Sequence, residues 1–144
     1  MLPANAVRKI RSMTDAPRPP IHLIDSEADR LGDLALAAEA RLPEVAELLL
    51  TEIERAAIHS AKAFPRGTVR MGARVDFLDE GSGTRRTVEL VYPPDADVAA
   101  GKLSILSLVG AGLIGLGEGQ RIRWPDRSGT ERVLRIEKVT PPAA

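Results

Sequence analysis

The sequence of 144 residues contains no cysteine, which excludes disulfide bonds and thiolate metal sites and leaves nothing that indicates an oxidising compartment. Its 20 basic and 20 acidic residues balance, so the chain lacks the overall positive charge typical of proteins that bind DNA or RNA directly. Aromatic residues are only 3% of the chain, too few for a surface on which single-stranded bases stack. We therefore expect a cytoplasmic protein whose partner is another protein.

Long apolar runs are also missing. The longest, residues 103–116, has about 14 residues interrupted by serines and glycines, whereas a membrane-spanning helix needs about 20. The basic residues within 8–11 are not followed by the apolar stretch of a signal peptide. Residues 1–20 end in a proline-rich segment that disfavours helix, and they are predicted to form a flexible leader.

Two stretches of helical periodicity follow this leader. In residues 26–40 the apolar side chains recur three and four positions apart, and Ser26 with an aspartate three residues on is typical of a weak capping box. Pro43 suits the first turn of a second helix, predicted over residues 43–59. Because only residues 41 and 42 separate them, the helices should form an antiparallel hairpin, a short coiled coil about 22 Å long.

The faces of the two helices follow from the same periodicity. The residues predicted to pack between the helices are Leu31, Leu34, Leu48, Leu49 and Ile53. The residues of the second helix that are expected to face solvent are Glu44, Glu47, Glu52, Glu54 and Arg55.

After Pro65 the apolar period changes from 3.6 to 2, which indicates strands. One β-hairpin is predicted over residues 69–92 with its turn at 79–83, and a second over residues 120–139. Four or five antiparallel strands with one short helix make an α+β domain.

Residues Gly101–Gly119 read as a short strand, a tight corner, a small-residue helix and a glycine turn. This block resembles the signature block of the C-terminal domain of bacterial transcript-cleavage factors of the Gre family and of their shorter relatives, the Rnk type, called regulators of nucleoside diphosphate kinase. The resemblance covers most of residues 21–140, with the parts in the family order. It implies an FKBP-like fold for the sheet domain and RNA polymerase as the partner.

Because the helical hairpin is short, the resemblance is closer to the Rnk type than to the cleavage factors. Within the chain it implies a helical hairpin at 21–62 and an FKBP-like domain at 63–140, which leaves the leader at 1–20 and a tail at 141–144. The chain departs from the family pattern at Leu108, where relatives usually have proline, and at Gln120, where an aspartate is common.

The resemblance implies a monomeric regulator that docks near the secondary channel of the polymerase and competes with Gre factors without cleaving transcripts. The residues matched to the docking corner of the family block are Leu106, Ser107, Leu108 and Val109. The alternative is that the apolar members of this set are core residues, since alternation places at least one of them inward.

The hairpin tip bears on catalysis, because Gre-type factors use acidic tip residues to hold Mg²⁺ for hydrolysis. This chain has Glu39, Arg41 and Glu44 near the turn, without the Gre tip sequence. We expect these to be ordinary solvated side chains, with Arg41 alternatively contacting an acidic surface. No catalytic residue, metal or cofactor is predicted.

Other readings of the sequence have less support. Residues 110–115 match the dinucleotide-binding pattern G-x-G-x-x-G, but no long helix or second parallel strand follows. His22 and His59 lack partners at metal-ligand spacing. An FKBP-like peptidyl-prolyl isomerase remains an alternative, although fold is weak evidence for function. Direct modulation of a nucleotide-metabolising kinase rests on the family name alone.

Overall fold

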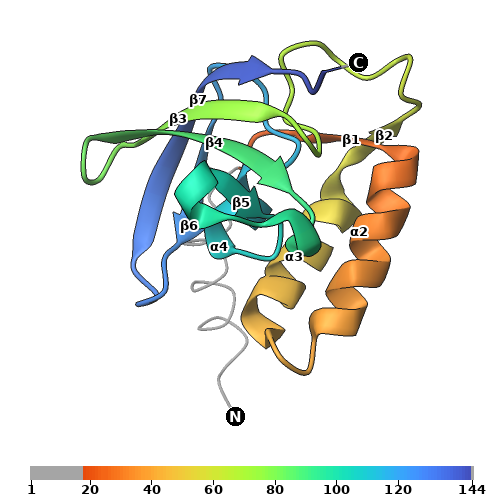
Figure 1. Ribbon diagram of the computed structural model, residues 1–144, viewed down its shortest axis with the longest axis horizontal. Helices are drawn as coiled ribbons and strands as arrows, with labels where there is room; N and C mark the ends of the chain where they lie inside the picture. Colours follow the sequence, from red (N-terminus) through yellow and green to blue (C-terminus); the bar gives the residue numbers. More distant parts are fainter. Residues whose placement is uncertain (1–17, 144) are drawn as a thin grey trace, which may run out of the picture.

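The computed structural model describes residues 18–143, in which a helical hairpin packs beside a five-stranded sheet (Figure 1). In chain order the elements are β1 (His22–Ile24), α2 (Asp25–Ala38), α3 (Pro43–Arg55), β2 (Ala57–His59), β3 (Arg74–Asp79), β4 (Thr84–Val91), η1 (Pro93–Asp95), η2 (Val98–Ala100), β5 (Lys102–Ser104), α4 (Leu108–Leu113), β6 (Arg121–Pro125) and β7 (Glu131–Thr140). The predicted α+β class is confirmed. Most of the predicted leader, residues 1–17, lies outside the described residues.

The large sheet has the strand order β5-β4-β3-β7-β6. Both predicted β-hairpins are present, as β3–β4 and β6–β7, and β3 joins them by pairing antiparallel with β7. The expectation of an all-antiparallel sheet is wrong for β5, which pairs with β4 in parallel. The reason is the connection over residues 92–101, which contains two short 3₁₀ turns. This connection returns the chain along β4, so that β5 starts beside it and runs in the same direction.

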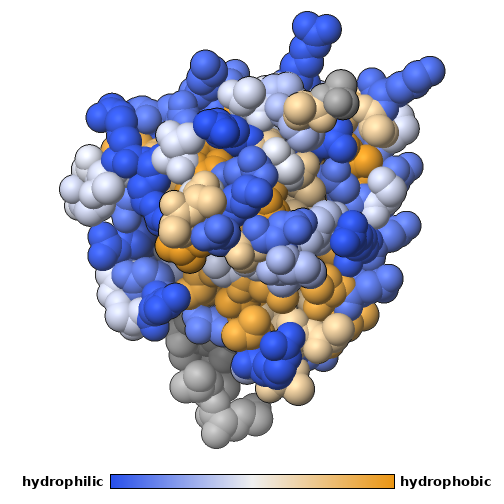
Figure 2. Space-filling view, in the orientation of Figure 1, coloured by the Kyte–Doolittle hydropathy of each residue, from blue (hydrophilic) through white to orange (hydrophobic). Residues whose placement is uncertain are grey.

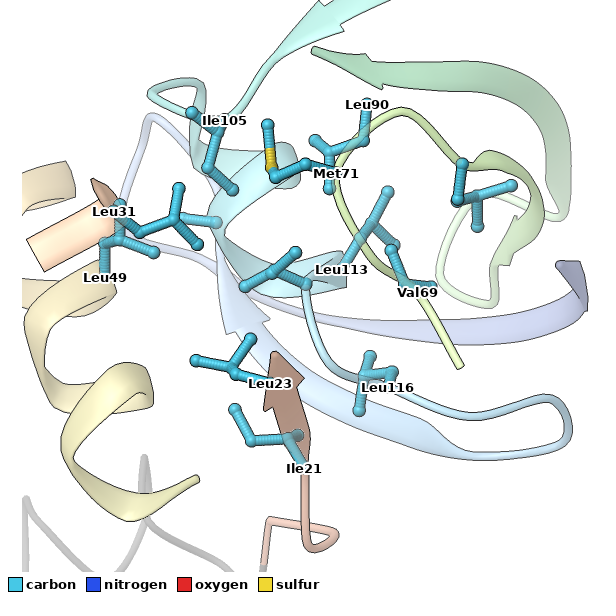
Figure 3. Close-up of a cluster of buried hydrophobic side chains, with 14 of the residues drawn as sticks. Ile21, Leu23, Leu31, Leu49, Val69, Met71, Leu90, Ile105, Leu113 and Leu116 are labelled. Atoms are coloured by element: carbon cyan, nitrogen blue, oxygen red, sulfur yellow. The ribbon is translucent and has the colours of Figure 1, made fainter. Parts of the chain in front are cut away.

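The two main helices pack against each other as the periodicity predicts. Leu31 on α2 and Leu49 on α3 are completely buried, and Figure 3 shows them next to one another. The other three predicted packing residues, Leu34, Leu48 and Ile53, are partly buried against the same core.

The helix ends differ from the prediction. Helix α2 starts at Asp25, so Ser26 lies inside it, and its N-cap residue is Ile24, which has no side chain that can cap the helix. Helix α3 ends at Arg55 rather than near His59, because Ala56 adopts an extended conformation and the next residues form β2. Strand β2 pairs in parallel with β1, a long-range contact that local periodicity does not encode.

Helices and sheet share one core. A single cluster of buried side chains contains Leu31 and Leu49 from the helices, Leu90 from β4 and Leu113 from α4 (Figure 3). The segment before β3 contributes Val69, whose backbone exchanges hydrogen bonds with Gly115 and Leu116 at the exit of α4. The helical hairpin is therefore held against the sheet by burial of apolar surface on both sides.

Glu52 is a further difference, because its side chain is 1% exposed where the pattern of α3 predicts a solvated carboxylate. It accepts hydrogen bonds from Arg18 at 3.1 Å and from Arg55 at 2.7 and 2.8 Å. Arg55 also donates to the Pro19 carbonyl oxygen at 2.7 Å. These contacts hold residues 18 and 19, the end of the predicted leader, against α3.

Within residues 18–143, none of the helices has both the length and the apolar character needed to cross a bilayer.

Candidate functional site

Two serines build the corner between β5 and α4. The Ser104 carbonyl oxygen accepts hydrogen bonds from the Ser107 backbone N–H at 3.0 Å and from the Ser107 hydroxyl at 2.6 Å. The Ser107 Oγ in turn accepts from the Gly110 N–H at 3.0 Å, so Ser107 is the N-cap of α4. The Ser104 Oγ accepts from the Leu106 N–H at 3.0 Å. This network fixes the direction in which residues 106–109 are presented.

Small residues let α4 lie close to the sheet. A Cβ atom at Gly110 would overlap the Ser104 carbonyl oxygen, and one at Gly112 would lie 2.9 Å from the Trp124 indole. Trp124 is 1% exposed and its Nε1 donates a hydrogen bond to the Leu108 carbonyl oxygen at 2.6 Å. Gly110 and Gly112 of the G-x-G-x-x-G match therefore serve helix packing, and the segment that follows is the antiparallel β6–β7 hairpin rather than a nucleotide-binding unit.

Replacing Ser107 by alanine should lower the free energy of unfolding by about 1 kcal/mol, because the first turn of α4 loses its cap. Ser26→Ala is the matched control, since Ser26 is exposed within α2 and its hydroxyl forms no hydrogen bond with any residue from 18 to 143. Urea denaturation of both variants measures the difference. Equal midpoints would contradict the capping role of Ser107.

The predicted docking residues are not equally accessible. Leu106 is buried, with 9% of its surface exposed, and belongs to the core. Ser107, Leu108 and Val109 are half-buried, and the two apolar ones pack partly against the core while keeping an outer surface. The alternative of a core role therefore applies to Leu106, and the accessible corner consists of Ser107, Leu108 and Val109.

This accessible corner forms one wall of a cavity of about 420 Å³. Its other apolar lining includes Leu103 on β5, Trp124 on β6 and Leu134 on β7, and Val98 on η2, which also lines it, is 86% exposed. Figure 2 shows apolar surface over the region where Figure 1 draws α4 and the helical hairpin, bordered by hydrophilic side chains. An apolar corner beside an open cavity is suited to a transient protein contact.

The hairpin tip carries the three side chains that the sequence singled out. All three are exposed: Glu39 and Arg41 lie in the turn after α2, and Glu44 lies just beyond it in α3. None of the three forms an ion pair with another residue of the described part of the chain. Glu44 lies in the first turn of α3, where the helix dipole favours a carboxylate.

The structure brings together the two histidines, which are distant in sequence. The His22 Nδ1 and the His59 Nε2 lie 2.9 Å apart across the β1–β2 pair, as hydrogen-bonded neighbours. The sequence could not indicate this contact, because it depends on strand β2. No cluster of three or more metal-ligating side chains occurs within residues 18–143.

Comparison with known proteins relates this geometry to a family. Residues 64–141, which include the corner and the whole large sheet, match the family model described as the C-terminal part of the transcription elongation factors GreA/GreB. The chain is 36% identical to the regulator of nucleoside diphosphate kinase of Escherichia coli K12 over 121 residues, which are 83% of this chain and 88% of that protein.

Two further relatives agree with this assignment. The chain is 32% identical over 123 residues to the transcription elongation factor GreA of Methylobacterium nodulans, covering 80% of this chain and 78% of that one. The solved structure of a prokaryotic transcription elongation factor GreA/GreB from Nitrosomonas europaea superimposes with a TM-score of 0.66 at 34% identity, covering 86% of this chain and 100% of the other. The chain therefore belongs to the GreA/GreB family of transcription elongation factors, together with the regulators of nucleoside diphosphate kinase.

Proposed function

We propose that this protein is a cytoplasmic, RNA polymerase-binding regulator of transcription of the Rnk type. In this proposal an FKBP-like sheet domain docks near the secondary channel of the polymerase through Ser107, Leu108 and Val109. The observation that carries the proposal is the position of this accessible corner within the matched family segment, residues 64–141. A rigid corner with a partly exposed apolar side chain is the kind of surface that anchors a small protein interface.

The helical hairpin supports a protein that occupies the polymerase channel rather than one that stimulates transcript cleavage. Helix α2 has 14 residues and α3 has 13, so the hairpin extends only about 20 Å as a short coiled coil. At its tip Arg41 lies between Glu39 and Glu44 in the sequence, which opposes the concentration of negative charge that a Mg²⁺ site requires. A docked protein of this shape would exclude Gre factors from the channel without supplying a metal site.

Competition with a Gre factor tests this function. Added to a backtracked elongation complex, the protein should leave transcript cleavage at its unstimulated rate, and it should reduce the cleavage stimulated by an added Gre factor. Both rates are read from the length of the labelled transcript with time. Stimulation of cleavage by this protein that disappears in Glu44→Gln would refute the occupancy mechanism.

Leu108→Asp should weaken polymerase binding at least tenfold, because a charge enters a contact that must lose water. Its effect on the free energy of unfolding should stay within about 1 kcal/mol, since the half-buried side chain lies at the first position of α4, where an acid is favourable. Leu36→Asp on α2 is the control, because Leu36 is 58% exposed and far from the corner in sequence. A large fall in melting temperature, with binding lost only in proportion to unfolding, would remove the docking role.

The two other functions weighed from the sequence have less support. An isomerase of the FKBP type needs a pocket lined by aromatic rings. Among residues 18–143, the only aromatic one that lines the 420 Å³ cavity is Trp124, which is 1% exposed. Direct modulation of a nucleoside diphosphate kinase is suggested by the name of the Escherichia coli relative, and no described residue of this chain carries it.

A further inference from the structure

Helix α4 is too short to cover the inner face of the sheet. Its six residues extend about 9 Å, whereas the ten residues of β7 extend about 33 Å. Alternation along the strands places Asp79 of β3, Arg86 of β4 and Arg132 of β7 on the same face as the buried Phe77. These three residues line the 420 Å³ cavity, which is therefore the part of this face that α4 leaves open.

The two carboxylates of the cavity are already engaged within the chain. Asp126 accepts hydrogen bonds from the Ser128 hydroxyl at 2.6 Å, the Thr130 N–H at 3.0 Å and Arg132 at 3.1 Å. The bond from Ser128 contributes most to lowering the pKa of Asp126 to about 2, so this carboxylate is ionised at neutral pH. Asp79 accepts from the Gly81 N–H at 3.0 Å and lies 3.8 Å from Arg132.

Two cations of the cavity have no such partner. Arg86 and Arg127 form no ion pair with any carboxylate of residues 18–143. Arg86 lies over the Phe77 ring, 5.8 Å from its centroid, and Arg127 is exposed in the turn between β6 and β7. Arg132 pairs with both aspartates of the lining, so the three arginines and two aspartates give a net charge of +1. The cavity thus combines an apolar lining with a small net positive charge, carried by two arginines that no described carboxylate pairs with.

We infer that this cavity receives an apolar side chain from an acidic amphipathic segment of the partner protein, with carboxylates of that segment pairing with Arg86 and Arg127. The inference rests on the proposed function, in which the partner is RNA polymerase. The apolar lining and the accessible corner favour an apolar anchor, and the two arginines favour negative charge beside it. Nucleic acid fits less well, because its affinity comes from several cations that neutralise phosphates, whereas this lining has three arginines against two aspartates.

Binding of the full chain to core RNA polymerase, measured at low and high salt, tests this inference. The double variant Arg86→Glu/Arg127→Glu should bind about tenfold more weakly at low salt, because attraction at both positions becomes repulsion. High salt should weaken the wild type and largely remove the difference between it and the variant. Arg74→Glu is the control for a charge reversal elsewhere on the sheet, since Arg74 is exposed on the outer face of β3 and forms no ion pair within residues 18–143. Arg86→Gln/Arg127→Gln should show a smaller loss in the same direction.

The outcomes separate this inference from the function on which it rests. One outcome is that Leu108→Asp loses polymerase binding while both double variants bind like the wild type. This result would support the docking corner and refute the acidic partner segment. If the double variants keep their affinity for polymerase and lose affinity for an RNA oligonucleotide, the arginines serve nucleic acid and the inference is wrong. Failure of the wild type to bind polymerase refutes the proposed function and the inference with it.

Discussion

Replacing Glu52 by glutamine is expected to lower the free energy of unfolding by about 3 kcal/mol. The carboxylate is 1% exposed and pairs with two arginines, and removing one partner of a buried ion pair leaves the others uncompensated. The effect should be largest at Arg18, because its side chain is 9% exposed and its Nε already lacks a hydrogen-bond partner among residues 18–143. Chemical denaturation followed by circular dichroism measures the change.

The control for Glu52→Gln is the same substitution at Glu47, which is exposed on the same helix. Glu47→Gln should change the free energy of unfolding by less than about 0.5 kcal/mol. Equal stability of the two variants would mean that the arginine contacts of Glu52 contribute nothing to the fold. Because these contacts connect α3 to residues 18 and 19, we also expect Glu52→Gln to increase hydrogen exchange in that segment.

Gly110→Ala should be comparably damaging, with a loss of about 3 kcal/mol. The added methyl group would overlap the Ser104 carbonyl oxygen and approach the Ser107 Oγ, so the corner must shift and the cap of α4 is disturbed. Since the corner presents Leu108, polymerase binding should fall more than the loss of folded protein explains. Thermal unfolding and binding, measured on the same sample, test both effects.

The same substitution at Gly32 is the control, and it should raise the free energy of unfolding instead of lowering it. Gly32 lies inside α2 and no atom would contact a Cβ built there, so Gly32→Ala should stabilise the protein by roughly 0.5–1 kcal/mol. A Gly110→Ala variant as stable as the wild type would show that the corner is not closely packed.

The local elements of this protein are encoded in short stretches of its sequence. The apolar stripes of residues 26–40 and 43–59 predict two packed helices, and the alternation around residues 69–92 and 120–139 predicts two β-hairpins. The small-residue block Gly101–Gly119 predicts the strand, corner and short helix that place Leu108 at the candidate site. These features depend on side-chain period and on glycine and proline, which act over a few residues.

Features that join distant segments required the tertiary structure. Strand β2 exists because residues 57–59 meet β1, and Glu52 is buried because Arg18 reaches it from 34 positions away. In both cases a long-range contact outweighs the local preference for a continued helix or a solvated acid. The cavity also depends on the tertiary structure. Its size follows from how little of the inner face of the sheet α4 covers, and its charge follows from which arginines form no ion pair with a described carboxylate. By itself the sequence determined the two helices, the two β-hairpins and the family resemblance. Only the packing decided the existence of β2, which corner residues are accessible and which charges surround them.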